Sequence, residues 1–168
     1  FFESVTFHDN NKNGRGFDVN YLNPIIFYRS IEHQLGDADK VMVGLNLNYL
    51  PFKGVQLYGQ FALNEFRIND LRAGNGHAAN KFAYQAGVYA TDVFGLSNLD
   101  FRIEYNRIRP YMYAHYTHQY DQWAVNSYGH YNQALAHPLG ANLSEILVRM
   151  DAQPWPKLSA RVNLIYSN

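Results

Sequence analysis

Aromatic, histidine and amide side chains gather in one stretch of the chain, between residues 109 and 143. Tyrosine and tryptophan present flat apolar rings with polar edges, and asparagine, glutamine and histidine add hydrogen-bonding groups. This mixture suits sugar rings, which have apolar C–H faces and hydroxyl edges. The residues that could contact a glycan are Tyr113, His115, Tyr116, Trp123, His130, Tyr131, Asn132, Gln133 and His137.

The histidines of this stretch could also suggest a metal site, but their spacing does not. A metal site needs at least three converging side chains with supporting hydrogen bonds. The four histidines His115, His118, His130 and His137 match no metal motif. On one strand, His115 and His118 would point to opposite faces. We therefore predict no metal and no cofactor.

A calcium loop is a weaker possibility near the start of the chain. The stretch Asp9–Gly14 matches the pattern Asp-x-Asn-x-Asn-Gly, but the twelfth position carries Asn20 in place of glutamate. The flanking residues also resemble strands, whereas helices flank a calcium loop of this kind. An ordinary asparagine- and glycine-rich loop is favoured, and calcium binding stays open.

Charged residues are few and balanced, with 14 Lys and Arg against 14 Asp and Glu. This balance argues against a nucleic-acid surface, which needs clustered cations. No nucleophile elbow, phosphate-binding glycine loop or prominent carboxylate pair is present, so no enzyme is predicted. We expect five charges to lie together and pair: Arg102, Glu104, Arg149, Asp151 and Arg161.

The elements that must position these groups are strands with period-two alternation. Residues 41–49 and 55–64 carry apolar side chains on one face and polar side chains on the other. Two further pairs follow at 82–93 with 99–108 and at 145–152 with 158–166. A length of about 9–11 residues suits a tilted strand that crosses a bilayer.

Short turns alternate with longer polar loops along the chain. The turns Pro51–Gly54, Phe94–Asn98 and Gln153–Lys157 join the pairs, and loops 67–80 and 109–143 separate them. Short periplasmic turns, long extracellular loops and apolar-out alternation are typical of an outer-membrane barrel. Aromatic residues beside the turns fit an interfacial belt. We therefore predict an all-β fold, an antiparallel transmembrane β-barrel in contact with outer-membrane lipid, with the five charges inside it.

A soluble β-sandwich or a soluble barrel is the alternative fold, because a sheet in either of them also has one wet and one buried face. The strands predicted here are longer than the usual five or six residues, which favours the membrane barrel. We interpret residues 1–168 as one barrel domain that is incomplete at both ends, with about eight strands and a free edge at Phe2 or Tyr166.

Two stretches of the sequence resemble a known family. Residues 21–32 (YLNPIIFYRSIE), followed by GDADK at 36–40, form the first, and residues 128–142 (YGHYNQALAHPLGAN) form the second. They resemble the Wzi family of capsule-assembly outer-membrane barrels, especially its Bacteroidetes branch, which includes proteins associated with gliding motility. The resemblance covers most of residues 20–168.

The resemblance implies a large barrel in the outer membrane of a Gram-negative bacterium that helps to attach capsular or other surface polysaccharide, without catalysis. Its partners would be lipid, polysaccharide and other envelope proteins. One alternative function is a structural membrane anchor in a gliding or secretion machine, and another is a passive porin. The aromatic residues of 109–143 would then plug the barrel mouth or contact a partner chain.

Overall fold

A computed structural model of the chain describes residues 1–6, 19–22, 40–65, 80–114, 128–130 and 133–168. The described residues confirm the all-β prediction, since their only helical segments are the short 3-10 turns η2 (Val19–Leu22) and η3 (Val93–Gly95). No helix among them is long and apolar enough to cross a membrane.

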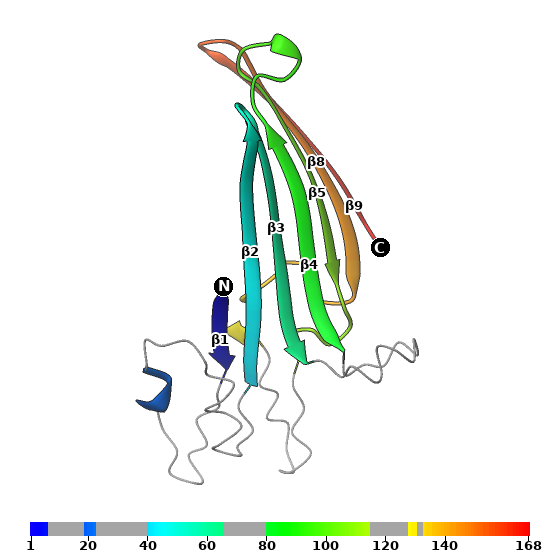
Figure 1. Cartoon of the computed structure of the whole chain (residues 1–168). Coiled ribbons are helices and arrows are strands. Elements are labelled where there is room, and N and C mark those ends of the chain that lie inside the picture. The colour runs from blue at the N-terminus through cyan, green and yellow to red at the C-terminus, as the bar shows by residue number, and fades with distance from the viewer. Residues whose placement is uncertain (7–18, 23–39, 66–79, 115–127, 131–132) are drawn as a thin grey trace.

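One curved seven-stranded sheet, with every neighbouring pair antiparallel, dominates the structure (Figure 1). Its strands, in spatial order, are β1 (Phe2–Thr6), β2 (Lys40–Phe52), β3 (Val55–Glu65), β4 (Lys81–Ala90), β5 (Leu99–Ile108), β8 (Leu143–Trp155) and β9 (Leu158–Ser167). A small hairpin of β6 (Gly129–His130) and β7 (Gln133–Ala134) forms a second sheet. The large sheet does not close on itself in the described residues, and β1 and β9 lie at its two edges.

The tight turns are placed differently from the prediction. β2 continues through Pro51 to Phe52, with a register shift after Tyr49, so only Lys53 and Gly54 remain in the turn. β8 likewise continues to Trp155 with a register shift after Ala152. An irregularity of this kind accommodates proline, which cannot donate a ladder hydrogen bond.

β4 ends earlier than predicted, at Ala90 rather than at residue 93. The chain reverses through Asp92 and Phe94, whose φ angles are 52° and 58°. A left-handed backbone cannot continue an extended strand. The turn is held by the Asp92 carboxylate, which accepts a hydrogen bond from the Asn98 backbone amide at 2.7 Å.

The strand register divides the six long strands (β2, β3, β4, β5, β8 and β9) into two faces. The apolar face consists of the odd-numbered residues of 41–49, 55–63 and 99–107 and the even-numbered residues of 82–90, 144–152 and 158–166. Arg107 is the one charged residue in this set, at the end of the sheet nearest the long loops. The alternation predicted from the sequence therefore matches the faces of the sheet.

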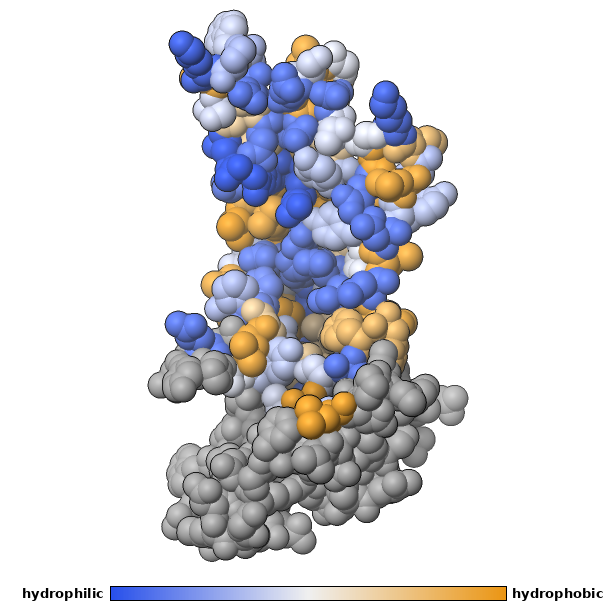
Figure 2. Space-filling model, turned by 90° about the vertical axis from the view of Figure 1, so that its left-hand side faces the viewer, coloured by the Kyte–Doolittle hydropathy of each residue, from blue (hydrophilic) through white to orange (hydrophobic). Residues whose placement is uncertain are grey.

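No described element covers the apolar face. Leu47, Leu164 and Ile103, near the middle of their strands, are 66%, 64% and 41% exposed. On the opposite, polar face, hydrophilic residues run along the strands. Figure 2 shows one side of the molecule, where hydrophilic residues, in blue, predominate above the grey residues. The sheet thus exposes a broad apolar surface and keeps its polar groups together on the other side.

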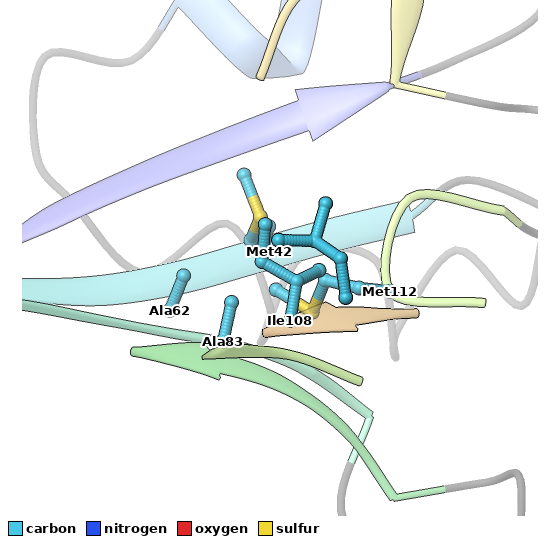
Figure 3. Packing of buried hydrophobic residues seen from close by; sticks show 6 residues of the cluster. Met42, Ala62, Ala83, Ile108 and Met112 are labelled. Atoms are coloured by element: carbon cyan, nitrogen blue, oxygen red, sulfur yellow. The ribbon is translucent and has the colours of Figure 1, made fainter. Parts of the chain in front are cut away.

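The buried core lies on the polar face, at the loop end of the sheet. Met42, Ala62, Ala83 and Ile108 come from four adjacent strands and meet Met112, which is fully buried (Figure 3). Met112 follows β5 in the chain and folds back over the sheet. A hydrogen bond from Asn64 Nδ2 to the Met112 carbonyl, at 2.5 Å, holds it there.

Candidate functional site

A cavity of about 360 Å³ lies between the polar face and the described parts of the segment that follows β5. Pockets for small ligands commonly have volumes of about 300–1,000 Å³. The sheet contributes one side of the cavity, and residues 113, 128 and 135–137 contribute the other. Phe2, at the edge of the sheet, also lines it.

Two neighbouring rows of residues cross the sheet below the cavity, and their central members, Ala62, Ala83 and Ile108 in one row and Gln60, Gln85 and Asn106 in the other, line it. The apolar row runs across five strands and consists of Gly44, Ala62, Ala83, Ile108 and Leu143. The amide row lies one step toward the turns and consists of Asn46, Gln60, Gln85, Asn106 and Glu145. The small side chains of Ala62 and Ala83 leave space above the sheet, and Gln60, Gln85 and Asn106 supply hydrogen-bonding groups at the side of that space.

Two tyrosines pack over these rows. The rings of Tyr113 and Tyr128 stack with centroids 6.5 Å apart, and the Tyr128 amide donates to the Tyr113 carbonyl at 2.8 Å. Burial raises the pKa of the Tyr113 phenol, and a hydrogen bond from the His137 backbone opposes this rise. The phenol is therefore neutral at physiological pH and keeps its proton available for donation.

A buried carboxylate joins the covering segment to the sheet. Glu145 is 6% exposed, and its Oε1 accepts a hydrogen bond from Asn106 Nδ2 at 3.0 Å. His137 Nε2 lies 3.2 Å from the same oxygen, while His137 Nδ1 accepts from the Leu139 amide at 3.3 Å. A ring nitrogen that accepts carries no proton, so these contacts fit the tautomer whose proton is on Nε2 and points to Glu145.

The hydrogen-bond network continues from the cavity along the polar face. Glu104 accepts from Asn106 Nδ2 at 2.9 Å, from Gln85 Nε2 at 3.0 Å and from the Tyr58 hydroxyl at 2.6 Å. The Arg102 guanidinium lies over the rings of Tyr58 and Tyr89, at 5.7 and 5.6 Å. These contacts give Glu104 three polar donors, and Arg102 two aromatic faces.

The remaining charges of the predicted network meet near the turns. Asp151 lies 2.5 Å from the Nε atoms of both Arg149 and Arg161. The Tyr89 hydroxyl donates to Asp100 Oδ2 at 2.7 Å. Asp100 is paired with Asp151 across β5 and β8. Three of the five predicted charges therefore form one cluster, while Arg102 and Glu104 are held by neutral neighbours.

The predicted glycan contacts fall into three groups. Tyr113 and His137 line the cavity, and Gln133 is exposed on β7, opposite His130 on β6. The five others lie outside the described residues: His115, Tyr116, Trp123, Tyr131 and Asn132. The calcium-like loop Asp9–Gly14 also lies outside them. No group of three metal-binding side chains occurs in the part of the chain that the structure describes.

Sequence reasoning missed the sheet side of the site. The alternation of residues 55–64 places Gln60 on a polar face, but it does not predict that Gln60 lies beside Gln85 and Asn106 of other strands. Glu145 precedes Leu147, Arg149 and Asp151 by the same two-residue spacing, and this spacing alone would have placed Glu145 on the polar face. Only the pairing register shows that these residues form one row.

Gly87 is required for the contact between Tyr58 and Glu104. A Cβ at Gly87 would lie 2.2 Å from Tyr58 Cζ, so the ring occupies the space that a side chain would fill. We expect Gly87→Ala to displace the ring, break its hydrogen bond to Glu104 and lower the free energy of unfolding by about 1–2 kcal/mol.

A double-mutant cycle checks this prediction. Tyr58→Phe removes the same hydrogen bond, so combining it with Gly87→Ala should cost less than the sum of the two single changes. Denaturant titration of the refolded protein measures all three variants. Strictly additive costs would show that Gly87 acts independently of Tyr58.

Comparison with known proteins adds no family to this description, since no family model, curated protein or solved structure matches the chain.

Proposed function

We propose that the chain is part of a β-barrel in the outer membrane of a Gram-negative bacterium, and that it binds or anchors surface polysaccharide through the cavity. This function is the one implied by the resemblance to the Wzi family. The observation that carries the proposal is the combination of an exposed apolar face with a polar cavity on the opposite face.

The dimensions of the apolar face support a membrane location. A strand of ten residues is about 33 Å long, and a tilt of about 40° reduces its height to roughly 25 Å, the height of the apolar band of outer-membrane barrels. β3, β4, β5 and β9 are 11, 10, 10 and 10 residues long, and β2 and β8 are 13 residues long. Each long strand could therefore cross the band.

The distribution of aromatic residues supports the same location. On the turn side, Tyr49, Phe52 and Trp155 are 59%, 74% and 64% exposed. On the loop side, the Tyr84 and Tyr105 rings lie 6.0 Å apart on the apolar face. Aliphatic residues occupy the middle. Tyrosine and tryptophan at both margins of an aliphatic band are typical of a membrane-spanning barrel.

The lining of the cavity supports polysaccharide as the ligand. Sugars expose apolar C–H faces and hydroxyl edges, and the cavity offers the apolar side chains of Ala62, Ala83 and Ile108, the rings of Tyr113 and Tyr128, and three amides. It lies at the loop end of the sheet, the end that faces outward in outer-membrane barrels. A surface glycan would therefore meet it from outside the cell.

Gln60 and Gln56 provide a matched test of this proposal. Both lie on the polar face of β3 and donate to an asparagine of β2, Gln60 to Asn46 at 2.8 Å and Gln56 to Asn48 at 3.0 Å. Only Gln60 lines the cavity. We expect Gln60→Leu to weaken polysaccharide binding about fivefold to tenfold through the loss of one hydrogen bond.

The assay measures binding of the host's purified surface polysaccharide to the intact protein, and heat-modifiable gel migration reports folding. Gln56→Leu should remain within about twofold of the unmodified protein, since it keeps the cavity intact. If neither the unmodified protein nor either variant binds while folding is preserved, a structural membrane anchor becomes the better function.

A further inference from the structure

We propose that the cavity selects a neutral sugar residue and excludes sugars that carry a carboxylate. This inference rests on the proposed function and adds the chemical class of the glycan. Three observations lead to it: the lack of lysine and arginine in the described lining, the use of most amide donors by the protein, and the carboxylates behind the cavity wall.

Among the described residues, the lining of the cavity carries no Asp, Glu, Lys or Arg side chain. Its polar members are the amides Gln60, Gln85 and Asn106, the tyrosines of the lining and His137. Carboxylates in proteins are bound by arginine, lysine or several converging N–H donors. The described part of the lining therefore offers no lysine or arginine to compensate for the lost hydration of an acidic sugar.

Four of the six N–H groups on the amides of the lining are already used by the protein. Gln85 Nε2 and Asn106 Nδ2 donate to Glu104, Asn106 Nδ2 also donates to Glu145, and Gln60 Nε2 donates to Asn46. An ionised carboxylate only accepts hydrogen bonds, so the amides of Gln85 and Asn106 must turn their nitrogens toward it. Asn106 uses both of its N–H groups in this way, whereas Gln60 and Gln85 each keep one. The side-chain carbonyl oxygens of the three amides therefore outnumber the N–H groups that are left for a ligand.

Carbonyl oxygens suit hydroxyl groups, which can donate, and they do not suit a carboxylate, which can only accept. Both nitrogens of His137 are also engaged, by Glu145 and by the Leu139 amide. Glu104 and Glu145 lie directly behind these groups and add negative charge near the cavity. Repulsion between like charges therefore opposes an acidic sugar further.

The volume of the site depends on small residues of the apolar row. Ala83 lies in this row, is 9% exposed and lines the cavity. A leucine at this position would extend into the cavity without changing its charge. Ala86 lies three residues along β4 on the apolar face and is exposed, so the same substitution there provides a matched control.

Paired hexasaccharides test the inference. The intact protein, purified from membranes in detergent, is titrated with gluco-, manno- and galacto-hexaoses, with the corresponding hexauronates, and with methyl-esterified hexagalacturonate. The ester keeps the ring and removes the charge. We expect the protein to bind only neutral members, each with an affinity at least tenfold higher than that of its uronate. We also expect the affinity for hexagalacturonate to rise when its carboxylates are esterified.

Ala83→Leu should weaken the binding of the neutral sugars at least tenfold, and Ala86→Leu should leave it within twofold. If the uronates bind as tightly as the neutral sugars or more tightly, and Ala83→Leu abolishes this binding, the charge selectivity is overturned and the proposed function is kept. Binding that Ala83→Leu does not change would place the glycan elsewhere, and it would overturn both the inference and the assignment of the cavity as the binding site while leaving polysaccharide binding itself. A folded protein that binds no member and no host polysaccharide would overturn both.

Discussion

Leu47→Arg is expected to lower the free energy of unfolding in a lipid bilayer by about 2–4 kcal/mol, the cost of an arginine on the lipid face of a barrel near the midplane. Leu47 lies near the middle of β2 and is 66% exposed on the apolar face. Its cross-strand neighbour is Gly59, which offers no carboxylate to the new cation. Urea titration of the protein folded into phosphatidylcholine vesicles measures the change.

Asn48→Arg is the matched control, one residue along the same strand and on the polar face. It loses only the hydrogen bond from Gln56, so we expect a cost below about 1 kcal/mol. A difference between the two neighbours shows that one face meets lipid. Equal costs at Leu47 and Asn48 would contradict the assignment of the apolar face to the membrane.

Asn106→Leu is expected to cost about 3 kcal/mol of stability, because it removes one charge-assisted hydrogen bond from each of two carboxylates that are wholly or partly buried. Asn106 is 4% exposed, and its Nδ2 donates to both Glu104 and Glu145. Leucine has nearly the same shape, so the substitution removes the hydrogen bonds without opening a large cavity. The same vesicle assay measures the loss.

Asn46→Leu is the control within the amide row. Asn46 is exposed and accepts one hydrogen bond, from Gln60, which water can replace. We expect it to cost less than about 1 kcal/mol. A similar cost for both asparagines would mean that the buried carboxylates do not depend on Asn106.

The faces of the long strands could be predicted because side chains alternate with a period of two whatever the pairing partner. Residues 41–49 and 158–166 show this pattern within their own sequence. The ends of the strands could not be predicted as well, since Asp92 and Phe94 adopt left-handed conformations that their residue types do not demand. Irregularities beside Pro51 and Pro154 lengthened β2 and β8 for a similar reason.

The cavity was beyond sequence reasoning because it depends on register across several strands. Gln60 and Glu145 belong to one row only because each intervening turn and irregularity sets the pairing that the structure shows. Arg102 illustrates the same point. A simple charge argument pairs it with Glu104, yet Gly87 lets the Tyr58 ring reach Glu104 from β3, and Arg102 lies over that ring.

The central claim is that the apolar face meets lipid, and a spin-label scan tests it most directly. The chain has no cysteine, so single cysteines at positions 45–49 and 146–150 can each carry one label. In the intact protein reconstituted into vesicles, collision with lipid-soluble oxygen should peak at 45, 47 and 49 and at 146, 148 and 150. Collision with a water-soluble nickel chelate should be greater at the intervening positions. Uniform access of the nickel chelate along both strands would contradict the account.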